Sequence, residues 1–523
     1  MARSALIPAH INSLADYIED TFTKYADRPA YSALGQEKTF AQMEVLSRQF
    51  AAWLQTHTSL KPGDRIAIQL PNLIQHPIAV YGALRAGLVV VNTNPLYTER
   101  EMEHQFNDSG TKALVILSDL LPKYENIKAN TSIKHVIVTS AAQLLSNAPV
   151  GHAEYTCYTQ IFEQAEGLTL QARPATNLDD TCFLQYTGGT TGVSKGAELS
   201  HQNVLANSLQ TLSRLGEALV DGEELVVCPL PLYHIYAFVV CMMTFFAKGS
   251  MILLIPNPRD MDGFVKSLQG HKFTAFAGIN TLFMGLCAQA DFKKLDFSKL
   301  KLTMSGGTAL TRSAATLWQQ TTGCSVTEGY GLSETSPVVS FNLPGKEHMG
   351  TVGPALDETH ILLLDENDQP VGEGQEGQIA VKGPQVMKGY WQRQDETDKV
   401  MTQDGYFKTG DIGVITADNC IKIVDRLKDM IIVSGFNVYP NEVEDILTQH
   451  PSVLEAAVVG KPDDRTQERV CAYVTVTEDY DQAALVEHCK KHLTNYKVPK
   501  EINVIDELPK STVGKILRRE LRG

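Results

Sequence analysis

The sequence lacks the features that mark membrane-spanning, secreted and disulfide-stabilised proteins. Its longest apolar run, residues 237–247, is about half as long as a membrane-spanning helix requires. Residues 1–10 contain no apolar core of a secretion signal, so we expect a cytoplasmic protein. The nine cysteines form no Cys-x-x-Cys pair and have no histidine partners at zinc-finger spacing, which favours free thiols in a reducing compartment.

Basic residues are too few for a general nucleic-acid-binding protein. The 46 Lys and Arg residues stand against 60 Asp and Glu residues, and the net charge of −14 opposes both nucleic acids and anionic lipid surfaces. No Lys/Arg-rich amphipathic helix offsets this charge, so we expect at most weak peripheral association with the inner face of the cell membrane. A polyanionic ligand must therefore be held by a local site.

Residues 184–196, with the sequence LQYTGGTTGVSKG, have the composition of a phosphate-binding loop. Gly188, Gly189 and Gly192 allow a tight turn that brings backbone N–H groups close to an anion. The side-chain donors are Thr187, Thr190, Thr191, Ser194 and Lys195. The apolar stretch 181–186 predicts a buried strand that leads into the loop. This is no Walker A motif, because Lys195 is followed by glycine; a flexible Gly/Ser/Thr linker is the alternative interpretation.

The hydrophobic pattern predicts an α/β fold of two doubly wound lobes followed by smaller parts. The first lobe spans 1–176, with helices expected at 13–25, 39–53, 75–87 and 99–109 and strands at 65–70, 88–92, 113–117 and 135–139. The second spans 177–350, with helices at 201–215 and 238–247 and strands at 224–228, 251–255, 273–277 and 300–305. Strands that alternate with helices at this spacing predict parallel sheets.

Past residue 351 the pattern changes to short strands with frequent glycines, which predicts a small β-rich subdomain over 351–427. Residues 428–523 contain two expected helices, at 441–449 and 482–493, among strands at 454–459, 470–476 and 501–504. That length suffices for a separate α+β domain. We therefore expect an N-terminal domain of residues 1–427 and a C-terminal domain of residues 428–523.

Four further stretches contain polar residues that are uncommon in a hydrophobic core. They are 229–236 with His234, 328–335 with Tyr330 and Glu334, the pair 408–411 and 425–426 with Asp411 and Arg426, and 509–515 with Lys515. An aromatic face suits a nucleotide base, a carboxylate suits a metal ion, and Asp411 with Arg426 could bracket a ribose. Each stretch taken singly is a weak signal, and a lone histidine such as His234 is more often structural than functional.

Together and in this order, these stretches resemble the adenylate-forming enzymes, which include acyl-CoA synthetases, luciferases and the adenylation domains of peptide synthetases. The resemblance covers almost the whole chain. Within this superfamily the stretches 92–97, 230–234, 382–387 and 429–442 are similar to those of bacterial long-chain fatty-acid–CoA ligases. The resemblance implies that a fatty carboxylate attacks the α-phosphate of ATP, releasing pyrophosphate, and that coenzyme A then displaces AMP from the acyl-adenylate.

The resemblance also implies site residues and ligands, with Mg²⁺ as the metal and fatty acid, ATP and coenzyme A as substrates. Thr187, Gly188, Gly189, Thr190, Thr191 and Lys195 would hold the phosphates of ATP, and Thr187 and Glu334 would hold Mg²⁺. Gly306, Gly307, Tyr330 and Gly331 would surround adenine, Thr335 would contact the α-phosphate, and Asp411 and Arg426 would bind the ribose. Lys515, Glu334 and His234 are the catalytic candidates, Lys428 is the hinge of a mobile C-terminal domain, and Ser434, Gly435 and Phe436 face coenzyme A.

Two alternatives to a long-chain ligase stay open. One is a ligase for a medium-chain or aryl acid, which would differ in an acyl pocket expected near 234–240, 277–283 and 336–339. The other is a non-catalytic nucleotide-binding protein of the same fold, against which the joint presence of the catalytic candidates argues. The segment 143–176 is short and acidic, whereas enterobacterial members of the family carry a basic insertion there, and Lys408 stands where the family often has histidine. A homodimer is one candidate assembly.

Overall fold

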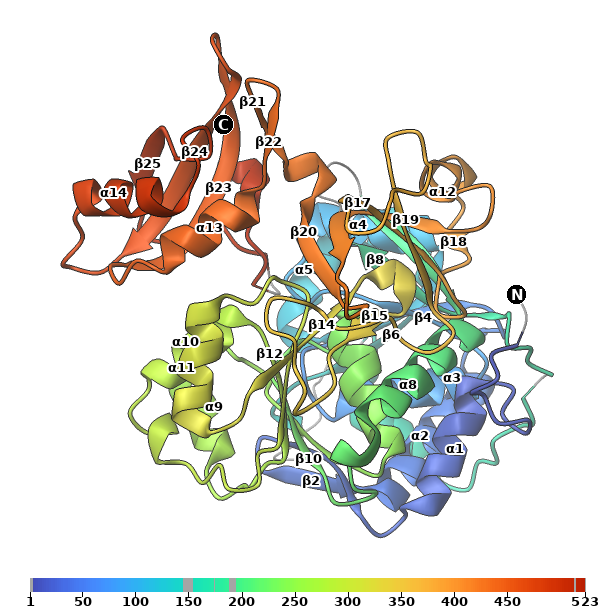
Figure 1. The fold of residues 1–523 in the computed structure, drawn as a ribbon. Helices are drawn as coiled ribbons and strands as arrows, with labels where there is room; N and C mark the ends of the chain where they lie inside the picture. The colour runs from blue at the N-terminus through green and yellow to red at the C-terminus, as the bar shows by residue number, and fades with distance from the viewer. Residues whose placement is uncertain (1–2, 144–153, 174, 188–193, 512–513, 523) are drawn as a thin grey trace.

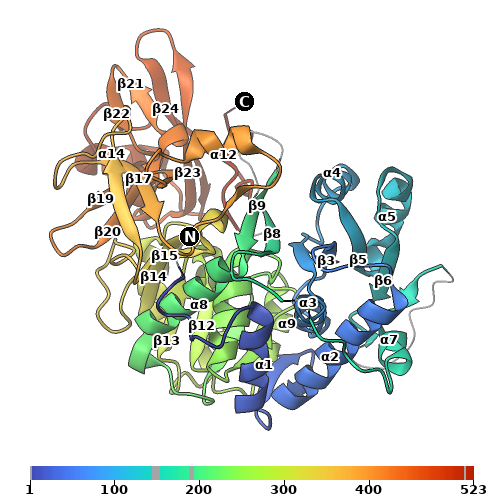
Figure 2. The same cartoon turned by 90° about the vertical axis from the view of Figure 1, so that its right-hand side faces the viewer.

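The computed structural model describes residues 3–143, 154–173, 175–187, 194–511 and 514–522. A large body carries two eight-stranded sheets and a four-stranded sheet, and a smaller C-terminal domain lies at the top of both views (Figures 1 and 2). This confirms the predicted α/β class with a large N-terminal and a small C-terminal part. Within the described ranges, no helix combines the length and the apolarity needed to span a bilayer.

The first eight-stranded sheet has the order β18-β9-β8-β4-β3-β5-β6-β7. Its strands are β3 (Arg65–Gln69), β4 (Val89–Asn92), β5 (Thr111–Leu117), β6 (His135–Thr139), β7 (Thr156–Cys157), β8 (Thr181–Thr187), β9 (Lys195–Ser200) and β18 (Gly389–Tyr390). Helices α2 (Phe40–His57), α3 (Gln75–Arg85), α4 (Glu99–Ser109), α5 (Leu121–Ile127) and α7 (Tyr158–Gln164) accompany it. Helices lie on both faces (Figure 2): Ile66 and Ile68 pack in the main core with α2 and α3, while Ala67 packs with α4 and α5.

The second eight-stranded sheet has the order β15-β14-β13-β12-β10-β11-β1-β2. Its strands are β1 (Pro29–Ala33), β2 (Gln36–Thr39), β10 (Leu225–Cys228), β11 (Met251–Leu254), β12 (Ala275–Gly278), β13 (Leu302–Ser305), β14 (Val326–Gly331) and β15 (Val338–Phe341). Its helices are α1 (Leu14–Lys24), α8 (His201–Leu215), α9 (Met261–Leu268), α10 (Asn280–Ala288) and α11 (Arg312–Thr322).

Sheet membership crosses the lobe boundary that we placed at residue 176. Strands β1 and β2 precede that residue yet belong to the second sheet, where Tyr31 of β1 lies opposite Ile252 of β11. Strands β8 and β9 follow it yet belong to the first sheet. Strand pairing depends on packing between residues that are far apart in the sequence, so the order of strands along the chain does not predict it. The two lobes are therefore interlocked.

The remaining strands form two smaller sheets. The four-stranded antiparallel sheet consists of β16 (His360–Leu364), β17 (Gly377–Lys382), β19 (Phe407–Ile415) and β20 (Ile421–Arg426), with α12 (Gln394–Val400) nearby. The C-terminal domain consists of β21 (Ile431–Val433), β22 (Phe436–Val438), α13 (Pro440–Thr448), β23 (Val453–Asp463), β24 (Gln467–Val476), α14 (Gln482–His492) and β25 (Glu501–Val504). Its apolar side chains form clusters separate from the main core.

The buried helix predicted at 238–247 is present and is a π-helix over Ala237–Phe245. All nine of its residues are buried. The sequence therefore has no polar face from which the number of residues per turn could be predicted. The wider turn leaves backbone groups to be satisfied by neighbours. Tyr81 of α3 supplies one such partner, since its hydroxyl donates to the carbonyl of Met242 at 2.8 Å.

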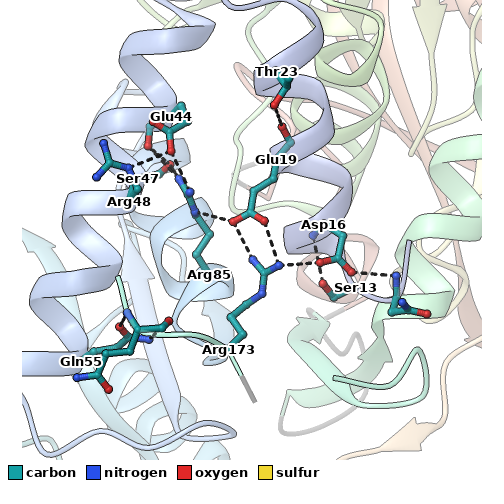
Figure 3. Close-up of polar contacts among 12 residues, drawn as sticks. Ser13, Asp16, Glu19, Thr23, Glu44, Ser47, Arg48, Gln55, Arg85 and Arg173 are labelled. Atoms are coloured by element: carbon teal, nitrogen blue, oxygen red, sulfur yellow. Dashed lines mark hydrogen bonds and ion pairs between the residues drawn. The ribbon is translucent and has the colours of Figure 1, made fainter. Parts of the chain in front are cut away.

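Arg173 attaches the segment that precedes β8 to α1, and Arg85 of α3 extends the same ion-pair network to α2 (Figure 3). Arg85 contacts the carboxylates of Glu19 and Glu44, each at 3.0 Å, and its side chain is only 5% exposed. Arg173 contacts Asp16 at 2.6 Å and Glu19 at 2.9 Å. The carboxylate of Glu19 contacts both arginines. The stretch that leads to the predicted phosphate loop is therefore attached to α1 through Arg173.

Candidate active site

The predicted phosphate loop is the tip of an antiparallel hairpin formed by β8 and β9, with Thr187 opposite Lys195. The sequence pattern predicted β8 but not β9. The Thr187 hydroxyl donates to the Lys195 carbonyl at 3.5 Å, at the base of the tip. Gly188, Gly189, Thr190 and Thr191 lie outside the described residues. The structure therefore places the two ends of the loop side by side.

Buried amide side chains hold the segment 229–236 at the carboxyl ends of the two sheets. Asn72, which follows β3, donates to the carbonyl of Leu230 at 2.8 Å and accepts from the backbone of Leu232 at 2.8 Å. Gln185 of β8 donates to the carbonyl of Tyr233 at 3.0 Å. Carboxyl ends of parallel strands are the usual ligand edge of open α/β sheets. This segment is thus fixed where a substrate would bind.

His234 follows directly in this segment and lies near Lys515. Burial, with a smaller effect from the positive charge of Lys515, lowers the pKa of His234 to about 4. Its Nδ1 accepts a hydrogen bond from the backbone N–H of Tyr236 at 3.4 Å. At pH 7 the imidazole is neutral with its proton on Nε2, so it can donate a hydrogen bond there but carries no charge.

The residues predicted for adenine and ribose come together at the junction of β14, β19 and β20. Asp411 and Arg426 are opposite each other in the β19–β20 pair, and the Arg426 Nε lies 3.0 Å from the Asp411 carboxylate. The Tyr330 hydroxyl donates to the other carboxylate oxygen of Asp411 at 2.5 Å. Burial, assisted by the Asp411 charge, raises the pKa of Tyr330, which keeps this donor protonated. Asp411 is only 3% exposed and is held rigidly by both partners.

Glycines at this site allow close approach. A Cβ on Gly331 would lie 2.0 Å from the carbonyl oxygen of Pro337, whereas one on Gly306 would make only an ordinary contact with the ring of Tyr236, at 3.5 Å. Gly307 has φ of 84°, a left-handed conformation that glycine adopts without strain. Tyr236 was not among the predicted site residues, although its ring lies against the glycine turn.

Glu334 and Thr335 lie in a 3₁₀ turn, Ser333–Thr335, that follows β14. Tyr390 of β18 donates its hydroxyl to the Glu334 carboxylate at 2.8 Å. Thr335 is fully buried, and its hydroxyl donates to the carbonyl of Pro337. In this structure that hydroxyl is part of the turn, and a contact between Thr335 and the α-phosphate stays a prediction.

The donor set suits Mg²⁺. Glu334 and Thr187 offer oxygen atoms, the ligands that Mg²⁺ prefers. In the part of the chain that the structure describes, no group of three His, Cys, Asp or Glu side chains is arranged to hold a metal by itself. Mg²⁺ commonly binds through one or two protein ligands together with substrate phosphates and water, so these residues fit a nucleotide-dependent metal site.

Lys515 reaches the predicted nucleotide site from the C-terminal domain. The preceding Gly514 packs so closely on the large body that a Cβ there would lie 2.4 Å from Ile279. Burial and then the charge of Arg426 lower the pKa of Lys515 to about 8, while Asp411 opposes the effect. The structure therefore brings Lys515 together with the predicted ribose-binding pair.

The predicted hinge and coenzyme A residues lie elsewhere on the C-terminal domain. Lys428 is in the turn Leu427–Asp429, directly after β20. Ser434 and Gly435, with φ of 51° and 83°, form the turn between β21 and β22. Phe436 is 57% exposed and stacks on Tyr496 with 4.9 Å between ring centroids. The β21–β22 hairpin lies on the side of the domain next to β20 (Figure 1), and Tyr439, which follows β22, donates to Glu376 of the large body at 2.6 Å.

The stretches expected to line an acyl pocket follow neighbouring strands of the second sheet. Strands β10 and β12 pair in parallel, and 234–240 and 279–283 lie beyond their carboxyl ends. Residues 336–339 end the connection from β14 and begin β15, at the edge of the same sheet. The topology therefore gathers these stretches along one edge, next to the nucleotide residues. Lys408, which differs from the family pattern, pairs with Asp368 at 2.9 Å.

Two family models match the chain in order. The AMP-binding enzyme model covers residues 18–391, and the model of the AMP-binding enzyme C-terminal domain covers residues 442–515. The first match alone spans well over half of the sequence. The chain therefore belongs to the family of AMP-binding enzymes.

Similarity to individual proteins extends from end to end. The long-chain-fatty-acid–CoA ligase of Salmonella typhimurium is 46% identical over 544 aligned residues, which cover 99% of this chain and 96% of the relative. The enzyme of the same name from Escherichia coli O6:H1 is 46% identical over 539 residues. Among solved structures, ATP-bound MatB from Rhodopseudomonas palustris matches with a TM-score of 0.86 at 28% identity, covering 98% of each chain.

Proposed function

We propose that this protein is an ATP-dependent long-chain fatty-acid–CoA ligase. It forms an acyl-adenylate from fatty acid and ATP with release of pyrophosphate, then transfers the acyl group to coenzyme A with release of AMP. The observation that carries the proposal is the position of Lys515 beside Arg426 and Asp411 in a chain that long-chain ligases match over 99% of its length. The rest of the site agrees with this chemistry.

The residues of the large body hold the nucleotide. Adenine lies at the turn of Gly306 and Gly307 and the ring of Tyr330, and Asp411 with Arg426 binds the ribose hydroxyls. The loop between Thr187 and Lys195 surrounds the terminal phosphates, where backbone N–H groups and hydroxyls act as donors. Thr187 and Glu334 would hold Mg²⁺ together with the phosphates, and the bound ion would neutralise phosphate charge.

Lys515 serves the first half-reaction. A pKa of about 8 leaves its amine mostly protonated at pH 7, so it can donate to both the fatty carboxylate and the α-phosphate. Negative charge accumulates between these groups as the new bond forms, and a positioned ammonium stabilises that charge. His234, neutral beside Lys515, can donate from Nε2 to the carboxylate without repelling the lysine.

The C-terminal domain, residues 428–523, serves the second half-reaction in a different orientation. Lys515 fills space that the coenzyme A thiol must enter, and the face formed by Ser434, Gly435 and Phe436 must reach the same site. Lys515 and the β21–β22 hairpin lie on different parts of one small domain, so both faces cannot occupy the site at once. Lys428 is the pivot, because a hinge needs only a few residues with free backbone rotation.

The protein works in the cytoplasm, with at most weak contact to the inner face of the cell membrane. The net charge of −14 opposes anionic lipid. Stoichiometric co-sedimentation with anionic vesicles at physiological salt would contradict this part of the proposal. A homodimer is one candidate assembly, and light scattering of the purified protein decides it.

The test of the proposed function uses ATP, Mg²⁺ and a panel of acids. We expect pyrophosphate release with long-chain acids, and acyl-CoA only when coenzyme A is added. Release with medium-chain or aryl acids alone would favour the alternative ligase. Nucleotide binding without pyrophosphate release from any acid would favour a non-catalytic protein.

A further inference from the structure

Residues 387–399, here called the crossing segment, contact strand β9, which follows the phosphate loop, and the turn that contains Glu334. In the segment, β18 pairs with β9, with Gly389 opposite Glu198. The backbone N–H of Trp391 donates to the Gly196 carbonyl at 2.8 Å, and that of Met387 donates to the Glu334 carbonyl at 2.8 Å. The crossing segment is therefore tied to both groups that the proposed function assigns to the polyphosphate and its metal.

Two side chains of the crossing segment contact these groups. Glu396 forms an ion pair with Lys195, with 2.7 Å between Oε2 and Nζ, and the same Nζ lies 4.5 Å from the ring centroid of Tyr390. The Tyr390 hydroxyl contacts Glu334 as described above. Lys195, which would hold the terminal phosphates, is therefore paired in this structure with a carboxylate of the protein itself, that of Glu396.

Glu396 also has a second cation within reach. Its other carboxylate oxygen pairs with Lys399, one helical turn further along α12. Lys195 first and Lys399 second lower the pKa of Glu396 to about 2, so the carboxylate is ionised throughout the physiological range. The Lys195 and Glu396 side chains are each 29% exposed, which leaves them open to an incoming anion. Glu396 can therefore break its ion pair with Lys195 and remain paired with Lys399.

We propose that Glu396 is an internal anion that competes with the polyphosphate for Lys195 and so promotes the departure of pyrophosphate. This inference rests on the proposed function. As ATP binds, its phosphates take Lys195 and repel Glu396, which turns to Lys399. Once the adenylate has formed, pyrophosphate is held without the rest of the nucleotide, and Glu396 returns to Lys195. No covalent bond of the protein changes in this exchange.

The test compares Glu396→Gln with Asp395→Asn in the full-length protein. Both variants remove one negative charge from α12, but Asp395 is 74% exposed and its nearest recorded cation is Lys399 at 4.0 Å. Calorimetric titration with inorganic pyrophosphate in the presence of Mg²⁺ gives the affinity directly. We expect Glu396→Gln to bind pyrophosphate roughly threefold to fivefold more tightly than the unchanged protein, as an ion pair of this exposure allows. Asp395→Asn should stay within about 1.5-fold.

A double-mutant cycle decides whether the effect acts through Lys195. In a Lys195→Met background, Glu396→Gln should improve pyrophosphate affinity by less than half as much, because Lys195, the cation for which the two anions compete, is absent. An equal improvement in both backgrounds, or an affinity of Glu396→Gln equal to or weaker than that of the unchanged protein, would overturn the inference. The proposed function is judged separately, by acyl-CoA formation in the unchanged protein, which calorimetry with pyrophosphate does not require.

Discussion

Replacing Lys515 with alanine should separate the two half-reactions. In this structure the Lys515 amine lies near Arg426 and Asp411, where it would face both the fatty carboxylate and the α-phosphate during adenylation. The thioester-forming step needs the same space for coenzyme A. Lys515→Ala should therefore impair the first half-reaction and spare the second.

The size of the loss follows from the environment of the amine. A pKa lowered from 10.5 to about 8 means that holding the charge in the nucleotide-free site costs ~3 kcal/mol. The ammonium is still mostly charged at pH 7, and a positioned donor of this kind is worth about 2.7–4 kcal/mol to the transition state. We expect adenylation to fall by about 10²-fold to 10³-fold, the range seen for loss of one charge-stabilising donor.

Each half-reaction has its own assay. Fatty-acid-dependent pyrophosphate release in a single turnover reports adenylation, and conversion of supplied acyl-adenylate with coenzyme A reports thioester formation. The matched control is Lys510→Ala, which changes a lysine of the same terminal segment that pairs with Glu455 at 2.7 Å. The control should retain both activities. Equal loss of both half-reactions in Lys515→Ala would refute the assignment of this lysine to the first step.

Three further predictions concern the hinge, pH and the stability of the body. Lys428→Pro fixes φ near −65° at the pivot, so first-turnover pyrophosphate release should persist while acyl-CoA formation falls by orders of magnitude; loss of both in proportion would argue against a hinge. Because the charge of Lys515 is lost as pH rises through about 8, kcat/KM for ATP should decline above that pH, and a profile flat to pH 10 would count against it. Arg85→Ala removes a buried guanidinium that bridges Glu19 and Glu44, which keep Arg173 and Arg48 as partners, and should lower stability by ~2 kcal/mol in thermal unfolding, whereas the exposed Arg48→Ala should cost less than ~0.5 kcal/mol; similar effects of the two would contradict the role given to Arg85.

Features set by local pattern and residue chemistry could be predicted from the sequence. Asp411 and Arg426 stand 15 residues apart in neighbouring strands, and the structure pairs them. The α/β class followed from alternating helices and strands. The proximity of Lys515 to this pair came from resemblance, because no local pattern links a residue near the end of the chain to the ribose site.

Features set by long-range packing could not be predicted. Strand β9 was missed because residues 195–200 form a short stretch after a glycine-rich turn, and its second partner, β18, is distant in the sequence. Tyr390 escaped notice for the same reason: only the β18–β9 pairing brings it to Lys195 and Glu334. The π-helix Ala237–Phe245 offered a uniformly apolar sequence in which every helical period fits equally well.

The central claim, ligation of long-chain acids to coenzyme A, is tested most directly by comparing kcat/KM for palmitate and acetate in one coupled assay with ATP, Mg²⁺ and coenzyme A. Each buried CH₂ contributes about 0.8 kcal/mol, so a pocket that accepts a long tail should discriminate strongly against a short acid. We expect acids of roughly twelve to eighteen carbons to exceed acetate by several orders of magnitude in formation of acyl-CoA. Equal kcat/KM for acetate and palmitate would contradict the account.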